Sequence, residues 1–107
     1  MPSPSSVIYY NRVVEALGEK QASDSVRLFM APGMGHCGGG EGPNVFDTVT
    51  AVEEWREHGK APAQMVASLI ADGTVVRTRP LCPYPQIAKY TGTGSIDRAE
   101  NFVCRAP

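Results

Sequence analysis

The first apolar stripe of the chain has helical spacing. Because its members recur every three or four residues, they share one face of a helix predicted over residues 7–17. Ser5 or Ser6 supplies the side-chain oxygen typical of an N-cap, and Gly18 is a typical stop. A polar connection follows over residues 19–25. The stripe consists of Val7, Tyr10, Val14 and Leu17.

A short apolar run, residues 26–30, then predicts a buried strand that leads into a glycine-dense loop over residues 32–43. After the loop, Asn44 fits an N-cap, and Asp47 lies in the first turn, where the helix dipole favours a negative charge. Gly59 is the predicted end of this second helix. The apolar stripe of this helix consists of Phe46, Val49, Val52 and Trp55.

Period-two patterning replaces helical spacing in the next segment. Residues 66–70 and 74–78 read as two short strands, and Asp72 and Gly73 between them are typical of a two-residue hairpin turn. Beyond Arg79 regular patterning fades, and prolines and glycines predict an irregular tail.

An ordered tail without secondary structure needs a crosslink, and Cys82 and Cys104 are the candidates. A disulfide closing a loop of that length would remove about 3 kcal/mol of unfolded-state entropy in the simple chain model. The competing interpretation is two buried thiols in a reduced compartment. The proline-rich flanks favour the disulfide.

Length and charge narrow the class of protein. The chain has 107 residues, enough for one domain with a small core, and a formal net charge of −1. That charge offers no electrostatic attraction for nucleic acid or an anionic membrane. No apolar stretch approaches the ~18 residues of a membrane span. The first residues lack the basic and apolar regions of a signal peptide, and Met1 resembles a start placed before a mid-protein sequence.

The glycine-dense loop holds the candidate chemistry, because His36 and Cys37 lie at its centre among five glycines between residues 33 and 40. Imidazole is the side chain whose charge changes near neutral pH, so His36 is suited to move protons. Glycines allow positive φ and close approach of the backbone to a ligand. The alternative is a flexible surface loop whose histidine has no role.

Three sharper interpretations of the same loop are weaker. Residues 33–38 match the spacing of a dinucleotide-binding fingerprint, but the following glycines and Pro43 prevent a helix from starting there. A zinc site would combine His36, Cys37, Cys82 and Cys104, yet no pair has the usual spacing, and adjacent ligands rarely reach one ion. A Cys37 nucleophile with His36 as base is awkward, because neighbouring side chains on an extended segment point to opposite sides.

The loop and the tail together resemble the C-terminal part of the tannase and feruloyl esterase family, and the likeness covers nearly the whole chain. The N-terminal helix, Ser6–Val14, resembles the family's helix before the histidine strand. The motifs that carry the resemblance are Pro32-Gly33-Met34-Gly35-His36-Cys37-Gly38-Gly39-Gly40, Gly42-Pro43-Asn44-Val45-Phe46-Asp47 with Trp55, Thr78-Arg79-Pro80-Leu81-Cys82-Pro83-Tyr84-Pro85, Lys89-Tyr90-Thr91-Gly92 and Asn101-Phe102-Val103-Cys104.

The resemblance implies a secreted or periplasmic serine esterase that cleaves small-molecule esters of aromatic acids without a cofactor. It implies that His36 is the triad histidine, which takes the serine proton and later protonates the leaving alcohol. It further implies that Cys37 forms a disulfide with the cysteine preceding the nucleophilic serine, and that Cys82 pairs with Cys104. The odd count of three cysteines is then explained, because the partner of Cys37 would lie outside this sequence.

The departures from the family matter as much. The sequence contains no G-x-S-x-G elbow and no serine preceded by cysteine, and none of its aspartates matches the position of the triad aspartate. The lid that selects the acyl group is also absent, and with it any calcium-ligand cluster. We therefore expect residues 1–107 to lack esterase activity alone.

The expected structure is an α/β fragment, the C-terminal segment of an α/β-hydrolase: helix, strand, loop, helix and β-hairpin, with a disulfide-tied irregular tail. The alternative function is a non-catalytic module that binds a partner or forms a homodimer, because an isolated piece of sheet exposes strand edges and apolar helix faces.

Overall fold

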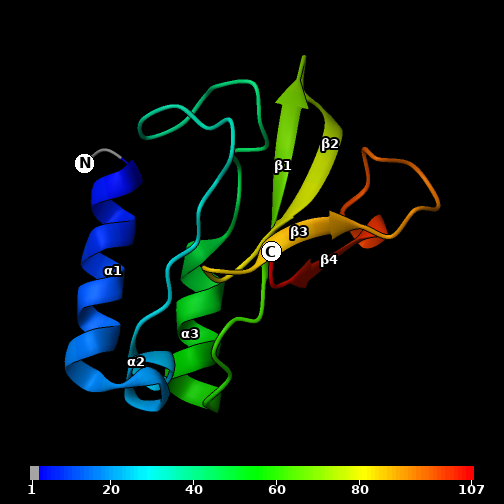
Figure 1. The fold of residues 1–107 in the computed structure, drawn as a ribbon. Coiled ribbons are helices and arrows are strands. Elements are labelled where there is room, and N and C mark those ends of the chain that lie inside the picture. Colours follow the sequence, from blue (N-terminus) through cyan, green and yellow to red (C-terminus); the bar gives the residue numbers. More distant parts are fainter. Residues whose placement is uncertain (1–2) are drawn as a thin grey trace.

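The computed structural model describes residues 3–107, so the interpretation of Met1 lies outside the described residues. Helices occupy the N-terminal half of the chain and two small antiparallel sheets occupy the C-terminal half (Figure 1). No helix within the described residues is long and apolar enough to cross a membrane. In chain order the elements are α1 (Ser3–Leu17), α2 (Glu19–Ser25), α3 (Thr48–His58), β1 (Met65–Ala71), β2 (Thr74–Leu81), β3 (Ile87–Tyr90), η1 (Ala99–Asn101) and β4 (Phe102–Arg105).

The predicted first helix is confirmed, although α1 begins at Ser3, several residues earlier than the apolar stripe suggested. Gly18 separates it from α2, with a φ of 83° that L side chains rarely adopt. The polar connection predicted over residues 19–25 is wrong, because this segment forms α2 and buries Ala22 completely. Alternating charges at helical spacing support α2, and Lys20 Nζ donates to the Asp24 carboxylate at 2.9 Å.

The prediction of a strand over residues 26–30 is wrong, because no strand of the structure includes these residues. The segment is extended and half-buried, and Figure 1 shows it running between α1 and α3. A strand needs a neighbour along its length, and here only a single bridge joins Phe29 to Pro83, with the Tyr84 amide donating to the Leu28 carbonyl at 2.7 Å. Pro83 itself has no N–H to extend a ladder. The apolar run therefore indicated burial correctly without producing a strand.

Helix α3 begins later than Asn44 suggested. Its N-cap is Asp47, whose carboxylate accepts from the Thr50 amide at 3.0 Å and the Thr50 hydroxyl at 2.6 Å. These two hydrogen bonds, the side-chain one first, hold the pKa of Asp47 below its ordinary value. The predicted end at Gly59 is confirmed, with a left-handed φ of 67°.

The apolar stripe of α3 is only partly covered. The Trp55 ring is half-buried beneath the Arg27 guanidinium, 5.8 Å from the ring centre. Val49 and Val52, by contrast, are 65% and 62% exposed, and within the described residues nothing covers them. The stripe therefore faces outward over much of its length.

The predicted hairpin is confirmed. Strands β1 and β2 pair antiparallel, and Asp72 and Gly73 at the turn have φ values of 52° and 77°. Two positive φ values match the turn whose twist suits a right-handed hairpin. A register shift between Leu69 and Ile70 accommodates one extra residue in β2.

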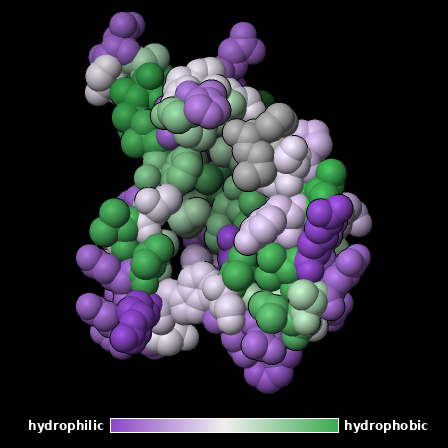
Figure 2. Space-filling view, turned by 90° about the vertical axis from the view of Figure 1, so that its left-hand side faces the viewer, coloured by the Kyte–Doolittle hydropathy of each residue, from purple (hydrophilic) through white to green (hydrophobic). Residues whose placement is uncertain are grey.

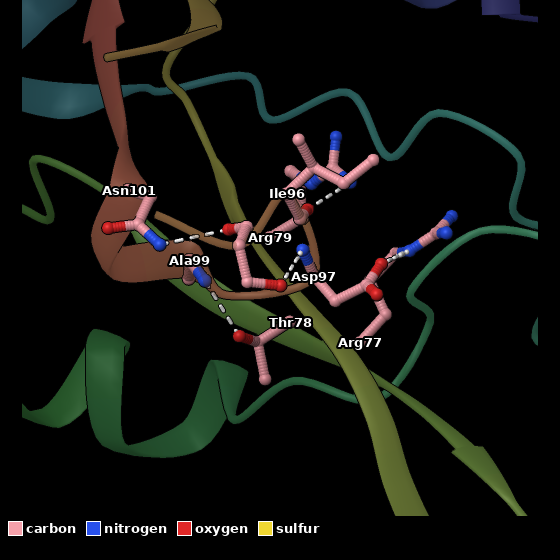
Figure 3. Close-up of polar contacts among 8 residues, drawn as sticks. Arg77, Thr78, Arg79, Ile96, Asp97, Ala99 and Asn101 are labelled. Carbon is pink, nitrogen blue, oxygen red and sulfur yellow. Dashed lines mark hydrogen bonds and ion pairs between the residues drawn. The ribbon is translucent and has the colours of Figure 1, made fainter. Parts of the chain in front are cut away.

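The tail is more regular than its sequence suggested, since β3 and β4 form a second antiparallel pair. The predicted bridge between Cys82 and Cys104 is present. Polar contacts hold the loop between β3 and β4 against β2 (Figure 3). Arg77 Nε donates to Asp97 at 2.8 Å, Arg79 donates to the Ile96 carbonyl at 2.9 Å, and the Ala99 amide donates to the Thr78 hydroxyl at 2.8 Å.

The core is small for the length of the chain. Its buried apolar residues are Ala22, Pro43, Ala67, Pro80, Leu81 and Cys82, and no large side chain is fully buried within the described part. The accessible surface is 7317 Å². A folded monomer of this mass, 11.5 kDa, is expected to expose about 5,800 Å².

Many large apolar side chains are exposed. Figure 2 shows apolar side chains gathered on the face that carries α1, around a hollow in its middle. The most exposed members of the apolar set are Ile8, Tyr9, Val49, Val52, Val75 and Ile96. They come from several elements, with Ile8 and Tyr9 on α1, Val49 and Val52 on α3, Val75 on β2 and Ile96 on the loop before β4.

Candidate functional site

The glycine-dense loop folds back on itself as a narrow hairpin. The Gly42 amide donates to the Gly33 carbonyl at 2.9 Å, and the Gly35 amide donates to the Gly39 carbonyl at 2.9 Å. Two limbs this close leave no room for side chains between them. A Cβ on Gly33 would lie 2.8 Å from the Gly42 nitrogen, and a Cβ on Gly40 would collide with the Gly33 carbonyl oxygen. The glycines thus allow the two limbs of the loop to pack directly against each other.

His36 and Cys37 occupy the tip of this hairpin, at the two central positions of a turn. The Gly38 amide donates back to the Gly35 carbonyl at 3.3 Å, and Cys37 has a φ of 64°. A positive φ at the second central position is the geometry of a type II turn, which favours glycine there. Both side chains are exposed.

The turn brings the two side chains together. The Cys37 Sγ lies 3.1 Å from the His36 Nδ1. The expectation that they point to opposite sides is wrong, because it assumed an extended segment and Cys37 is in the left-handed region. Within the described residues no hydrogen bond engages the other ring nitrogen, Nε2, of His36. The free nitrogen is therefore the one available for proton transfer.

The base of the loop is anchored to β1. The amides of Asn44 and Val45 both donate to the Ser68 carbonyl, at 3.0 and 3.1 Å, and the Ser68 amide donates to the Val45 carbonyl at 2.8 Å. The Asn44 side chain donates to the Gly42 carbonyl at 3.1 Å, which joins the anchor to the loop. Sequence reasoning assigned Asn44 to a helix cap and missed this role, since its partner lies more than twenty positions along the chain.

Cys82 and Cys104 are not part of the loop site. Their sulfurs are joined in the tail, so neither is a thiolate ligand, and the combination considered for zinc cannot form in this state. Cys37 is the free cysteine. The remaining histidine, His58, is the last residue of α3. Its Nδ1 lies 3.4 Å from the Glu54 carboxylate, so its partner is on its own helix and not on the loop.

A cavity of about 480 Å³ lies behind the loop, but the two candidate side chains do not reach into it. Its walls include Gly33 and Gly42 at the loop base and Leu81 and Ile87 from the sheets, and neither His36 nor Cys37 is among them. The imidazole instead faces open surface. A substrate pocket at His36 would need walls from outside the described residues.

Comparison with known proteins gives a consistent result. The family model for tannase and feruloyl esterase matches residues 1–105. The mono(2-hydroxyethyl) terephthalate hydrolase of Piscinibacter sakaiensis is 47% identical over 102 residues, covering 92% of this chain and 17% of that protein. Feruloyl esterase B of Aspergillus niger is 32% identical over 119 residues, covering 95% of this chain and 23% of that protein.

The solved structures agree with the sequences. The crystal structure of feruloyl esterase B from Aspergillus oryzae superimposes with a TM-score of 0.85 at 28% identity, covering 96% of this chain and 24% of that one. A second esterase from the same organism gives a TM-score of 0.86 at 27% identity, with the same coverage. The chain thus spans between 17% and 24% of these relatives.

Proposed function

Since this chain belongs to the tannase and feruloyl esterase family, we propose that it supplies the catalytic histidine of a serine esterase acting on esters of aromatic acids. The observation that carries the proposal is the position of His36. Its ring stands at the tip of an anchored hairpin, with Nδ1 in contact with a neighbour and Nε2 open. An imidazole held in this way is oriented to exchange a proton with one incoming group.

In the proposed reaction, Nε2 of His36 takes the proton of a serine hydroxyl as its oxygen attacks the ester carbonyl. The protonated imidazole then donates that proton to the leaving alcohol, and the cycle repeats with water to release the aromatic acid. The 107 residues contain no G-x-S-x-G elbow. The nucleophile, the triad carboxylate and the oxyanion donors are therefore assigned to other parts of the enzyme.

We also propose that the chain is a segment of an α/β-hydrolase domain. The segment over residues 26–30 supports this, because it is extended, lies beside α1 and α3, and is bonded to the tail through Leu28 and Phe29. A further strand along its other edge would complete a ladder. The tail disulfide supports secretion or export to the periplasm, where such bonds persist.

A chimera tests the proposal. In the Piscinibacter sakaiensis hydrolase, the matching segment is replaced by this chain, and hydrolysis of mono(2-hydroxyethyl) terephthalate and of a feruloyl ester is measured. Loss of a general acid–base lowers kcat by roughly 10²–10⁴-fold or more, so we expect His36→Gln to cause at least such a loss. His58→Gln is the matched control, because His58 is the second of the two histidines and lies on α3. Equal losses in both variants would contradict the assignment.

The second candidate, a self-associating module, is favoured by the exposed apolar side chains of α1 and α3. The 107-residue chain alone would then form a dimer that buries these faces, with or without the family's chemistry. Light scattering across a range of protein concentrations measures this, and a monomer at the highest concentration would exclude it.

A further inference from the structure

The joint between the glycine-dense hairpin and its anchor on β1 is the peptide that links Gly42 to Pro43. On the hairpin side, the Gly42 amide donates to the Gly33 carbonyl at 2.9 Å. On the anchor side, the Asn44 amide donates to the Ser68 carbonyl at 3.0 Å. Between them Pro43 has no N–H, so it cannot donate a hydrogen bond that would fix the joint.

The Asn44 carboxamide crosses this joint. Its Nδ2 donates to the Gly42 carbonyl at 3.1 Å, and the bond is partly buried. That carbonyl belongs to the planar peptide between Gly42 and Pro43, so the side chain fixes the plane of the joint. A residue whose own amide is held by β1 thus also holds the end of the hairpin's outgoing limb.

The incoming limb is attached further from the hairpin. Its bridge to the tail joins Phe29 to Pro83, several residues before the first bond between the limbs. Pro32 lies in that interval and has no N–H either. The attachment next to the base of the hairpin is therefore the one made by Asn44.

We infer that Asn44 is a positioning residue for the proposed reaction, because its carboxamide fixes the direction in which the hairpin presents His36. The inference rests on the proposed function, in which His36 exchanges the protons. Asn44 is not a catalytic residue in this assignment, since its side chain bonds to the backbone of the loop base and not to the imidazole.

The hairpin transmits a tilt at its base to its tip. Its limbs are packed too closely to slide, because a Cβ on Gly42 would collide with the Pro32 carbonyl oxygen. The five residues from Gly42 to the tip at Cys37 span at most roughly 17 Å, so a tilt of about 4° displaces the tip by about 1 Å. A displacement of about 1 Å in a catalytic group costs up to about a hundredfold in rate.

The first test measures the direction of the hairpin in the 107-residue chain, from residual dipolar couplings of the backbone amides after labelling with ¹⁵N. In the parent chain, one alignment should fit the amides of Gly35 and Gly40 together with those of β1. Asn44→Asp is isosteric but its carboxylate donates no hydrogen bond, and Asn44→Ala removes the polar group without adding a charge. We expect the hairpin couplings to shrink and leave the common fit in both variants, while those of β1 and β2 stay.

Asn101→Asp is the matched control. The Asn101 Nδ2 likewise donates to a carbonyl of its own loop, that of Ser95, at 2.9 Å, but this loop lies between β3 and β4 (Figure 3). The same atoms are changed, and the hairpin should keep its direction.

The second test measures kcat and KM in the chimera with the Piscinibacter sakaiensis hydrolase. Asn44→Asp and Asn44→Ala should each lower kcat roughly two- to tenfold, since one hydrogen bond of ordinary strength sets the fraction of molecules with His36 in place. KM should not change, because the imidazole acts in the transition state and does not hold the substrate. Asn101→Asp should leave both constants as they are in the parent chimera.

Three results would overturn the inference. They are a hairpin that keeps its direction in both Asn44 variants, a loss of kcat in Asn44→Asp alone, which would identify the added charge as the cause, and an equal loss in Asn101→Asp. A chimera that is inactive with the parent sequence contradicts the proposed function instead. The couplings of the 107-residue chain involve no substrate, so they still decide whether Asn44 directs the hairpin.

Discussion

Removal of the bridge between Cys82 and Cys104 is the perturbation whose effect the structure determines most directly. The two residues are 22 positions apart, and Cys82 is one of the few buried apolar residues. In the chain-entropy model, a closed loop of that length stabilises the folded state by about 3 kcal/mol. The bridge also joins the end of β2 to β4, whose Cys104 pairs with Ala88 of β3.

That magnitude is large for this chain. Domains of this size unfold with a free energy of roughly 5–15 kcal/mol, and the small core places this chain near the lower end. We expect Cys82→Ala with Cys104→Ala to lower the free energy of unfolding by about 3 kcal/mol and the midpoint temperature by roughly 10–20 °C. Urea unfolding followed by circular dichroism measures the first quantity, and a thermal scan measures the second.

Cys37→Ala is the matched control, because it removes a cysteine that is exposed and free. It should leave both measurements within about 0.5 kcal/mol of the parent chain. A loss below about 1 kcal/mol in the double variant would refute the reasoning. It would mean that the loop around Arg77 and Asp97 orders the tail without the crosslink.

Two further predictions concern the loop and the helix that follows it. Gly40→Ala places a Cβ against the Gly33 carbonyl of the opposite limb, whereas the Cβ of the control variant Gly39→Ala meets open space. Hydrogen exchange at the Gly42 amide should therefore be roughly tenfold faster in Gly40→Ala than in Gly39→Ala. Equal exchange rates in the two variants would show that the limbs are not in contact. Bonds from Thr50 hold the pKa of Asp47 below its ordinary 3.8, so its charge stabilises the folded chain above that pH, and the contribution fades as pH falls through the folded-state pKa. The difference in unfolding free energy between the parent chain and Asp47→Ala should therefore become smaller in acid. Asp47→Asn is the control, because its amide keeps a cap whose strength does not vary with pH. A difference that stays constant with pH would contradict the role of the Asp47 charge.

Sequence alone determined the features whose causes lie within a few residues. Asp72 and Gly73 tolerate the positive φ of a tight hairpin, so the turn between β1 and β2 followed from the pair itself. Gly59 ended α3 for the same reason. The clustering of glycines around His36 also marked the loop, because glycine allows positive φ and close approach of two backbone segments. These signals act locally and need no knowledge of distant partners.

Tertiary structure decided the features that depend on partners far along the chain. The apolar run over residues 26–30 became an extended segment with one bridge, because strand pairing requires a neighbour that its own sequence cannot supply. Strands β3 and β4 formed in a tail with little patterning, because the disulfide to Cys82 and the ion pair between Arg77 of β2 and Asp97 order that tail.

The site shows the same division. His36 was identified from its residue type and surroundings, but its contact with Cys37 depends on one backbone dihedral angle, a φ of 64°. That angle arises because the two limbs of the hairpin close on each other and Asn44 and Val45 fasten them to β1. The two adjacent side chains came together because the chain turns between Gly35 and Gly38, whereas the expected opposite arrangement assumed an extended backbone.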